Sequence, residues 1–224
     1  MKNTVLLEEK KVKISISWYE KLNGSLVAYF GFAFSIFFLT ISAMLYGNSE
    51  SSFSLLTTYI SDLGAASRDS SLIFAVGMII SAPVRVLFGL YLLKYLESKG
   101  GKSKTLKNTA KAVIIGAIGS IALAVFPHDV FRIGHMLGSL IYFVSVVIIQ
   151  INISKLELRL KNTPKYLPIL GILVVISYVL FLTFEISEIA FEGFRYIAIA
   201  LEWLAYFILM MWLVTHGYYI QKTK

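Results

Sequence analysis

The titratable side chains of this sequence that could do chemistry gather at the ends of long apolar runs. Asp62 belongs to the segment Thr58-Tyr59-Ile60-Ser61-Asp62-Leu63-Gly64, which is too apolar for a plain solvated loop and too short to cross a bilayer. We expect a short interfacial or re-entrant turn that holds Ser61 and Asp62 near the mouth of a helical bundle, with Gly64 permitting the tight turn. The alternative is that Asp62 only caps a helix end.

A second polar group follows the sequence Phe126-Pro127. His128 and Asp129 come first, and Arg132 and His135 follow at three-residue intervals, a spacing that would bring them together on a helix. Two histidines beside a carboxylate could hold a divalent metal, so His128, Asp129 and His135 are candidate ligands. The alternative is a polar network that closes a tight interhelical turn. A zinc hydrolase usually needs three convincing ligands, so the sequence itself requires no cofactor.

A third group is acidic. Glu185, Glu188 and Glu192 have i, i+3, i+7 spacing, and Arg195 follows three residues later. The spacing favours a solvated face for Glu188 and Glu192. The other interpretation is a funnel for lipid headgroups, with Glu185 and Arg195 in its lining.

Two charges fall inside apolar runs. Arg85 lies about 21 Å of helix from the start of its run, and Glu202, next to Trp203, lies about 10 Å beyond Arg195. A charge in the hydrocarbon region costs about 2.5–3.5 kcal/mol, so both should face the bundle and have partners. An Arg85–Glu202 ion pair and a role in a site are the two interpretations. We expect His216, at the end of the last run, to be an interfacial residue.

The elements that must position these residues are membrane helices. The chain is 57% hydrophobic and only 15% charged, with a mean hydropathy of +0.75. Six apolar runs approach the length of a span, and they occupy residues 25–46, 71–96, 112–127, 133–152, 166–184 and 196–216. The predicted fold is all-α, a polytopic six-helix transmembrane bundle. One membrane domain, 25–217, lies between an N-terminal segment, 1–24, and a tail, 218–224.

Basic residues orient this bundle. Of the 21 lysines and arginines, 17 fall on one side, in the N-terminal segment, the second and fourth loops and the tail. The positive-inside rule makes that side cytoplasmic, so both termini are predicted to be cytoplasmic in a multi-pass protein of the cell membrane. The net charge of +8 therefore reflects the bilayer, and no nucleic-acid partner is expected. With no cysteine in the chain, disulfides and thiolate sites are excluded.

Several of these segments carry a family resemblance. Tyr59-Ile60-Ser61-Asp62-Leu63-Gly64, Phe126-Pro127-His128-Asp129 with His135, and Glu192-Gly193-Phe194-Arg195 with Trp203 resemble the prokaryotic membrane family called domain of unknown function 998. Ile60-Ser61-Asp62 and Glu202-Trp203 are also similar to the eukaryotic Frag/DRAM/Sfk group. That group is associated with lipid remodelling, lipid distribution and autophagy. The resemblance implies a lipid-related role centred on Asp62, Asp129, His135, Arg195 and Glu202.

Three functions follow from these residues. The first is an outward-facing polar pocket that binds or modifies a lipid headgroup, with Asp62 and His135 as acid/base candidates and Arg132 or Arg195 as phosphate anchors. A metal-dependent or proton-coupled hydrolase is its sharper form. The second is transport of an ion or small solute past Arg85 and Glu202. The third is a non-catalytic membrane scaffold or sensor. The pocket residues common to these readings are Ser61, Arg85, His128, Asp129, Arg132, Glu185, Arg195, Glu202 and Trp203.

Overall fold

The computed structural model describes residues 21–47, 52–188 and 191–223, and these form helices joined by loops, with no strand in the described ranges. Six helices are long and apolar enough to cross a membrane, which confirms the predicted fold class. They are α2 (Gly24–Leu45), α3 (Ser71–Ser98), α4 (Ser103–Val125), α5 (Arg132–Glu157), α6 (Tyr166–Glu188) and α7 (Arg195–Thr223). Two short 3-10 helices, η1 (Ser61–Gly64) and η2 (Glu192–Phe194), lie in the connections.

Several helices extend beyond the apolar runs from which they were predicted. Helix α4 begins nine residues before the predicted start at residue 112, because Lys104, Lys107 and Lys111 lower the hydropathy without lowering helix propensity. Helix α5 continues to Glu157, and α7 continues to Thr223. Polar residues that looked interfacial are therefore carried inside helices.

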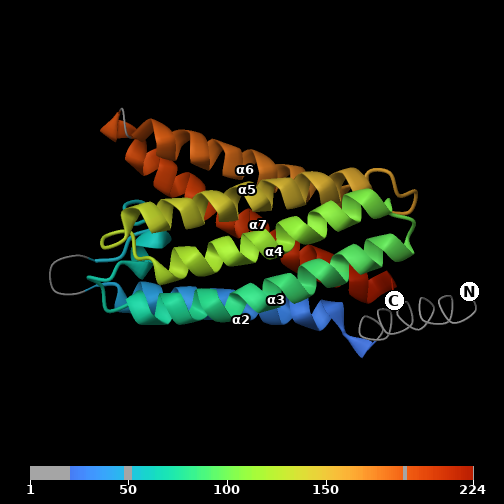
Figure 1. The fold of residues 1–224 in the computed structure, drawn as a ribbon, viewed down its shortest axis with the longest axis horizontal. Helices are drawn as coiled ribbons and strands as arrows, with labels where there is room; N and C mark the ends of the chain where they lie inside the picture. The colour runs from blue at the N-terminus through green and yellow to red at the C-terminus, as the bar shows by residue number, and fades with distance from the viewer. Residues whose placement is uncertain (1–20, 48–51, 189–190, 224) are drawn as a thin grey trace, which may run out of the picture.

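The six helices form a closed ring. Each packs against its neighbour in the sequence, and α7 packs against α2 to complete the circuit (Figure 1). The start of α2 and the end of α7 lie at one end of the bundle, together with the turns at 99–102 and 158–165. We call this the basic end. The opposite end carries residues 52–70, 126–131 and 191–194, and we call it the loop end.

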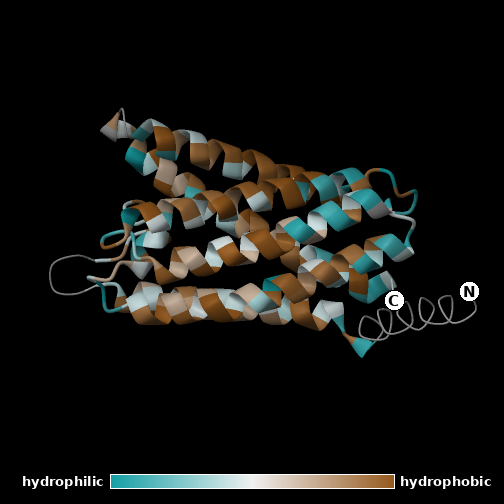
Figure 2. Cartoon of the chain, viewed as in Figure 1, coloured by the Kyte–Doolittle hydropathy of each residue, from teal (hydrophilic) through white to brown (hydrophobic). Residues whose placement is uncertain are grey.

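The outer surface of the ring suits a hydrocarbon solvent. Hydrophobic residues cover the middle of the helices, and hydrophilic ones gather toward the two ends (Figure 2). Large apolar side chains such as Met44, Leu72 and Ile133 are more than 70% exposed. Serines, in contrast, point inward: Ser42, Ser81 and Ser145 are buried. This inversion of the pattern of a soluble protein is what a lipid bilayer environment produces.

Helices α4 and α5 approach most closely through glycines. A side chain at Gly119 would meet the backbone nitrogen of Tyr142 at 2.7 Å, and one at Gly138 would meet the backbone nitrogen of Leu123 at 2.7 Å. Small residues allow this close approach of membrane helices, in which van der Waals contact replaces the hydrophobic effect. The contact fixes the turn at 126–131, which carries His128 and Asp129.

Candidate functional site

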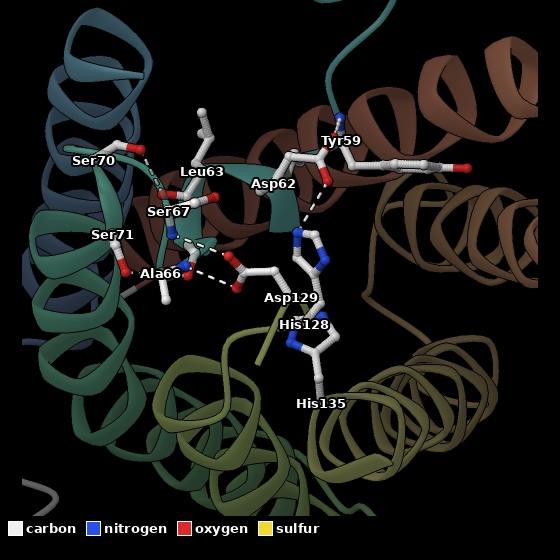
Figure 3. Close-up of polar contacts among 12 residues, drawn as sticks. Tyr59, Asp62, Leu63, Ala66, Ser67, Ser70, Ser71, His128, Asp129 and His135 are labelled. Carbon is white, nitrogen blue, oxygen red and sulfur yellow. Dashed lines mark hydrogen bonds and ion pairs between the residues drawn. The ribbon is translucent and has the colours of Figure 1, made fainter. Parts of the chain in front are cut away.

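The segment 52–70 folds over the loop end of the ring. Its single turn of 3-10 helix, η1, agrees with the predicted short turn, and Leu63 within it is fully buried. Gly64 serves through close approach rather than through a positive φ, since a side chain there would meet the Phe74 ring at 2.6 Å. The hydroxyl of Ser70 donates to the Leu63 carbonyl at 2.7 Å and closes the segment (Figure 3). We call residues 52–70 the loop-end cover.

Helix α7 ties the cover down with two neighbouring side chains. The backbone N–H of Ile60 donates to Glu202 Oε2 at 2.7 Å, and Trp203 Nε1 donates to the Thr58 carbonyl at 2.9 Å. Glu202 and Trp203 are both buried. The two sequence elements Ile60-Ser61-Asp62 and Glu202-Trp203, far apart in the chain, are thus in direct contact.

The α4–α5 turn ties down the other side of the cover. Both carboxylate oxygens of Asp129 accept backbone hydrogen bonds, from Ala66 N–H at 2.9 Å and from Ser67 N–H at 3.0 Å (Figure 3). Burial alone would raise the pKa of Asp129, but these two N–H groups hold the pKa below its usual value. Asp129 is therefore a clamp on the cover.

An ion-pair group lies above the ring. His128 Nε2 lies 3.3 Å from Asp62 Oδ1, and Arg195 Nη2 lies 3.7 Å from Asp62 Oδ2. The Tyr59 backbone N–H also donates to Asp62 Oδ2 at 3.0 Å. The contact with Asp62 raises the pKa of His128 above its ordinary value, against the opposing effect of burial. Asp62 thus joins the cover to the α4–α5 turn and to α7.

Glu188 completes this group, and the prediction of a solvated Glu188 was wrong. Its carboxylate accepts a hydrogen bond from the Tyr59 hydroxyl and pairs with Arg195 Nη1 at 3.1 Å. The Arg195 guanidinium also lies over the Tyr59 ring, 5.0 Å from its centre. Burial, followed by the hydrogen bond to Glu188, raises the pKa of Tyr59, so the phenol keeps its proton and stays a donor. The spacing of the glutamates did not reveal this, because the hydrogen-bond partner of Glu188 is Tyr59, which is distant in the sequence.

The remaining candidates lie around this group. The prediction that Asp129, Arg132 and His135 cluster on a helix was wrong, because α5 begins only at Arg132 and Asp129 turns toward the cover. Arg132 is exposed, and Glu185 is half-buried one turn before Glu188. His135 Nδ1 contacts the Phe126 carbonyl at 2.9 Å, and its ring packs edge-on against His128.

The predicted acid/base and metal-binding roles depend on which of these side chains are in contact. In the described ranges the histidine that contacts Asp62 is His128, and no ion pair or hydrogen bond joins Asp62 to His135. Within the same ranges, no group of three or more His, Cys, Asp or Glu residues has the geometry to hold a metal ion. The side chain of Glu192 lies outside what the structure describes.

Beneath the cover, the ring encloses two cavities that we together call the lumen. The upper cavity, about 80 Å³, is lined by residues of all six helices and by Ile60 and Ser61 of the cover. The lower cavity, about 100 Å³, continues toward the basic end as far as Ile153 and Leu213. The two share five lining residues, Ser35, Ser81, Arg85, Tyr142 and Met210.

Both intramembrane charges line the upper cavity, but they do not pair with each other. Arg85 Nη2 donates to Ser120 Oγ on α4 at 2.8 Å, and its guanidinium lies 5.8 Å from the centre of the Tyr142 ring. Glu202 is held by Ile60 near the loop end. Of the two sequence interpretations, the structural ion pair is thus not formed.

Sequence reasoning missed a second carboxylate–histidine pair at the basic end. His216 Nε2 lies 2.8 Å from Glu157 Oε1, and both side chains are 1% exposed. The prediction of an interfacial His216 was wrong because α5 and α7 extend past the apolar runs and bury the pair. A signal was present: Gln150, Ser154 and Glu157 follow i, i+4, i+7 spacing and so share one face of α5.

Comparison with known proteins assigns the chain to a family. No curated protein and no solved structure matches the chain. The family model described as a protein of unknown function, DUF998, matches residues 25–219, from α2 to nearly the end of α7. The chain is a member of the DUF998 family of membrane proteins.

Proposed function

We propose that the protein binds the polar headgroup of a membrane lipid in the upper cavity. Following the positive-inside rule, the proposal assigns the basic end to the cytoplasm and the loop end to the outer face of the cell membrane. The observation that carries it is the lining of the upper cavity. The guanidinium of Arg85 and the carboxyl group of Glu202 share one cavity within the hydrocarbon region without pairing.

The lining has the chemistry that headgroup recognition needs. Tyr142, Tyr178 and Tyr206 add aromatic faces and hydroxyls to the two charges. Aromatic faces and a carboxylate favour an ammonium group, and a guanidinium favours a phosphate. The resemblance of Ile60-Ser61-Asp62 and Glu202-Trp203 to the Frag/DRAM/Sfk group gives the same expectation by analogy.

The contacts of Asp62, one of the two acid/base candidates, favour binding of the headgroup over its chemical modification. Asp62 is engaged by His128, Arg195 and the Tyr59 backbone, so its oxygens serve the fold of the cover. A general base must reach the proton that it abstracts, and these contacts keep Asp62 above the lumen.

Native mass spectrometry of protein extracted from its own membranes tests the proposal. Glu202→Gln keeps an oxygen for the Ile60 N–H and removes the ionisable carboxyl group, so the cover should stay in place while lipid occupancy falls. Glu97→Gln, which changes an exposed carboxylate at the basic end, is the matched control. Equal lipid in wild type and Glu202→Gln, or none in wild type, would contradict the proposal.

Transport of an ion or small solute is the second candidate, and the lower cavity favours it. The lumen extends from Ser61 near the loop end to Gln150 on the basic side of Arg85, so a few polar side chains line it on both sides of Arg85 within a mostly apolar wall. Solute flux into liposomes that Glu202→Gln abolishes would support transport. Lipid retention without flux over a broad panel of ions and small solutes would exclude it in favour of binding.

A further inference from the structure

We infer that Arg85 binds the anionic group of the ligand, a phosphate or a carboxylate, inside the lumen. The inference deepens the proposed function by naming the chemistry of the bound group. The inference depends on the proposed function only in naming a lipid as the source of the anion, and a free solute is the other possible source.

The first argument is the charge of Arg85. Arginine keeps its proton in proteins, so its charge persists inside the bilayer, where it is costly unless paired. Across residues 21–47, 52–188 and 191–223, no carboxylate lies within 4.0 Å of Arg85. Arg195, at the loop end, has two such partners. Within the described ranges, the peripheral arginine thus has carboxylate partners, and the central one has no carboxylate in contact with it.

The second argument is the kind of contact that Arg85 does make. Ser120 Oγ accepts from Arg85 Nη2 at 2.8 Å and donates its own proton to the Ala117 carbonyl at 2.9 Å. That hydroxyl orients the guanidinium but does not neutralise it. Arg85 lines both cavities, and its guanidinium has further donors beyond the one that Ser120 accepts.

The third argument is the set of unpaired buried polar atoms around the same space, in which two hydrogen-bond donors stand beside one acceptor, Gln150 Oε1 of the lower cavity. The buried Tyr206 hydroxyl in the upper cavity and the buried Trp212 Nε1 in the lower cavity have no hydrogen-bond partner among the described residues. Buried donors that stay unpaired are costly, so their presence indicates an acceptor-rich ligand. A guanidinium, a phenol and an indole N–H together suit an anionic oxygen group.

The position and size of the lumen narrow the ligand further. Glu202, held by the Ile60 N–H about 10 Å along α7, lies nearer the loop end than Arg85, about 21 Å along α3. Cavities of about 80 and 100 Å³ hold a small group with several waters rather than a whole lipid. The bound part is therefore the phosphate or carboxylate, and any acyl chain lies elsewhere.

Thermal unfolding of the purified protein in a non-ionic detergent tests the inference with two probes. Inorganic phosphate represents a free anion. Lysophosphatidylglycerol represents a lipid anion, and a monoacylglycerol of the same chain length, which lacks the phosphate, is its control. Arg85→Gln removes the charge, and Arg85→Lys keeps the charge and serves as the second variant if Arg85→Gln folds poorly. The control is Arg132→Gln, which changes an exposed arginine at the loop end.

We expect an anionic probe to raise the Tm of wild type and Arg132→Gln by several degrees, because it binds only the folded state. The apparent affinity should fall about 10- to 100-fold in Arg85→Gln, the usual effect of losing a charge-assisted hydrogen bond, and less in Arg85→Lys. A response to lysophosphatidylglycerol alone identifies a lipid as the source, and a response to phosphate identifies a free anion.

Two results would overturn the inference: an equal response of wild type, Arg85→Gln and Arg85→Lys, or no response of wild type to either probe. The two proposals fail separately. If Glu202→Gln releases lipid while Arg85→Gln and Arg85→Lys respond to both probes as wild type does, headgroup binding survives and the anion site does not. If wild type carries no lipid but responds to phosphate through Arg85, the anion site survives and lipid binding does not.

Discussion

The two ends of the bundle each hold a carboxylate–histidine pair, in opposite environments. At the loop end, His128 and Asp62 have side chains 35% and 16% exposed and share their site with Arg195. At the basic end, His216 and Glu157 are each 1% exposed and meet at 2.8 Å. The same two side-chain types therefore form a solvent-accessible, screened contact in one place and a desolvated contact in the other.

The buried pair is also more tightly defined in its protonation. His216 Nδ1 lies 2.8 Å from the Trp212 carbonyl, and a carbonyl can only accept, so Nδ1 carries a proton. One further proton must then lie between Nε2 and Glu157 Oε1, whichever atom holds it. The comparison teaches that the pair at the loop end can open and re-form in water, whereas the pair at the basic end is part of the core.

The largest expected effect comes from breaking the buried pair. Glu157→Ala leaves the His216 ring without its partner in the core, and losses of this kind cost about 3–5 kcal/mol. For a chain of this size we expect Tm in detergent to fall by roughly 10 °C. Glu97→Ala, which breaks an exposed Lys94–Glu97 pair, should change Tm by no more than about 1–2 °C. A Glu157→Ala variant as stable as the control would show that the pair is not part of the core.

The second prediction distinguishes the net contribution of the pair to stability from the cost of leaving one buried polar side chain without its partner. Glu157→Leu with His216→Leu replaces both polar groups by apolar ones, and such replacements of buried pairs are often neutral. We expect the double variant to regain at least half of the Tm lost by either single variant. A double variant as unstable as the sum of its singles would mean that the two residues act independently.

The contrast between the ends also explains which features could be predicted from sequence. Hydropathy predicted six spans because each run is long and apolar, and the positions of Ser61, Asp62 and Glu202 near the loop end followed from span length. Glu157 and His216 were missed because the two residues are 59 positions apart in the chain, on different helices, and lie beyond the apolar runs. Glu188 was misassigned for a similar reason, since its partner Tyr59 is 129 residues away.

Pairings between distant segments depend on how the ring closes, and local spacing does not specify them. Asp129 illustrates this: its spacing with Arg132 and His135 indicated a helical cluster, but the Phe126-Pro127 turn delays α5 until Arg132. Asp129 is then free to accept the backbone N–H groups of the cover.

The third prediction concerns this clamp, which the loop end has in addition to its ion pairs. Asp129→Ala removes the acceptor for Ala66 and Ser67, and because Asp129 is exposed we expect only about 1 kcal/mol of destabilisation. Hydrogen–deuterium exchange of residues 58–70 should rise, whereas the basic end should exchange as in wild type. Asp69→Asn, an exposed carboxylate of the same cover, is the control. Unchanged exchange at 66–67 would remove Asp129 from the role of clamp.

The clamp also has a pH dependence of known sign. The pKa of Asp129 is lower in the folded protein than its usual value, so its contribution is complete above the unfolded-state value of about 4. The contribution is lost as the pH falls through the lower, folded-state pKa. Protection of the cover should therefore weaken in acid in wild type, and Asp129→Ala should abolish that part of the pH dependence.

The smallest effect is expected at the exposed His128–Asp62 pair, and its pH dependence has the opposite sign to that of the Asp129 clamp. The pKa of His128 is raised by Asp62, so the pair stabilises the fold fully below the unfolded-state value of about 6.5 and loses this contribution as the pH rises through the folded-state pKa. Because His128 is about one-third exposed, the contribution should stay below about 1 kcal/mol and decrease with salt. An NMR titration of labelled histidine in wild type and Asp62→Asn measures it directly. The variant should return the pKa of His128 toward its ordinary value, and a pKa that ignores both the substitution and the salt would mean that Asp62 is not the partner that governs His128.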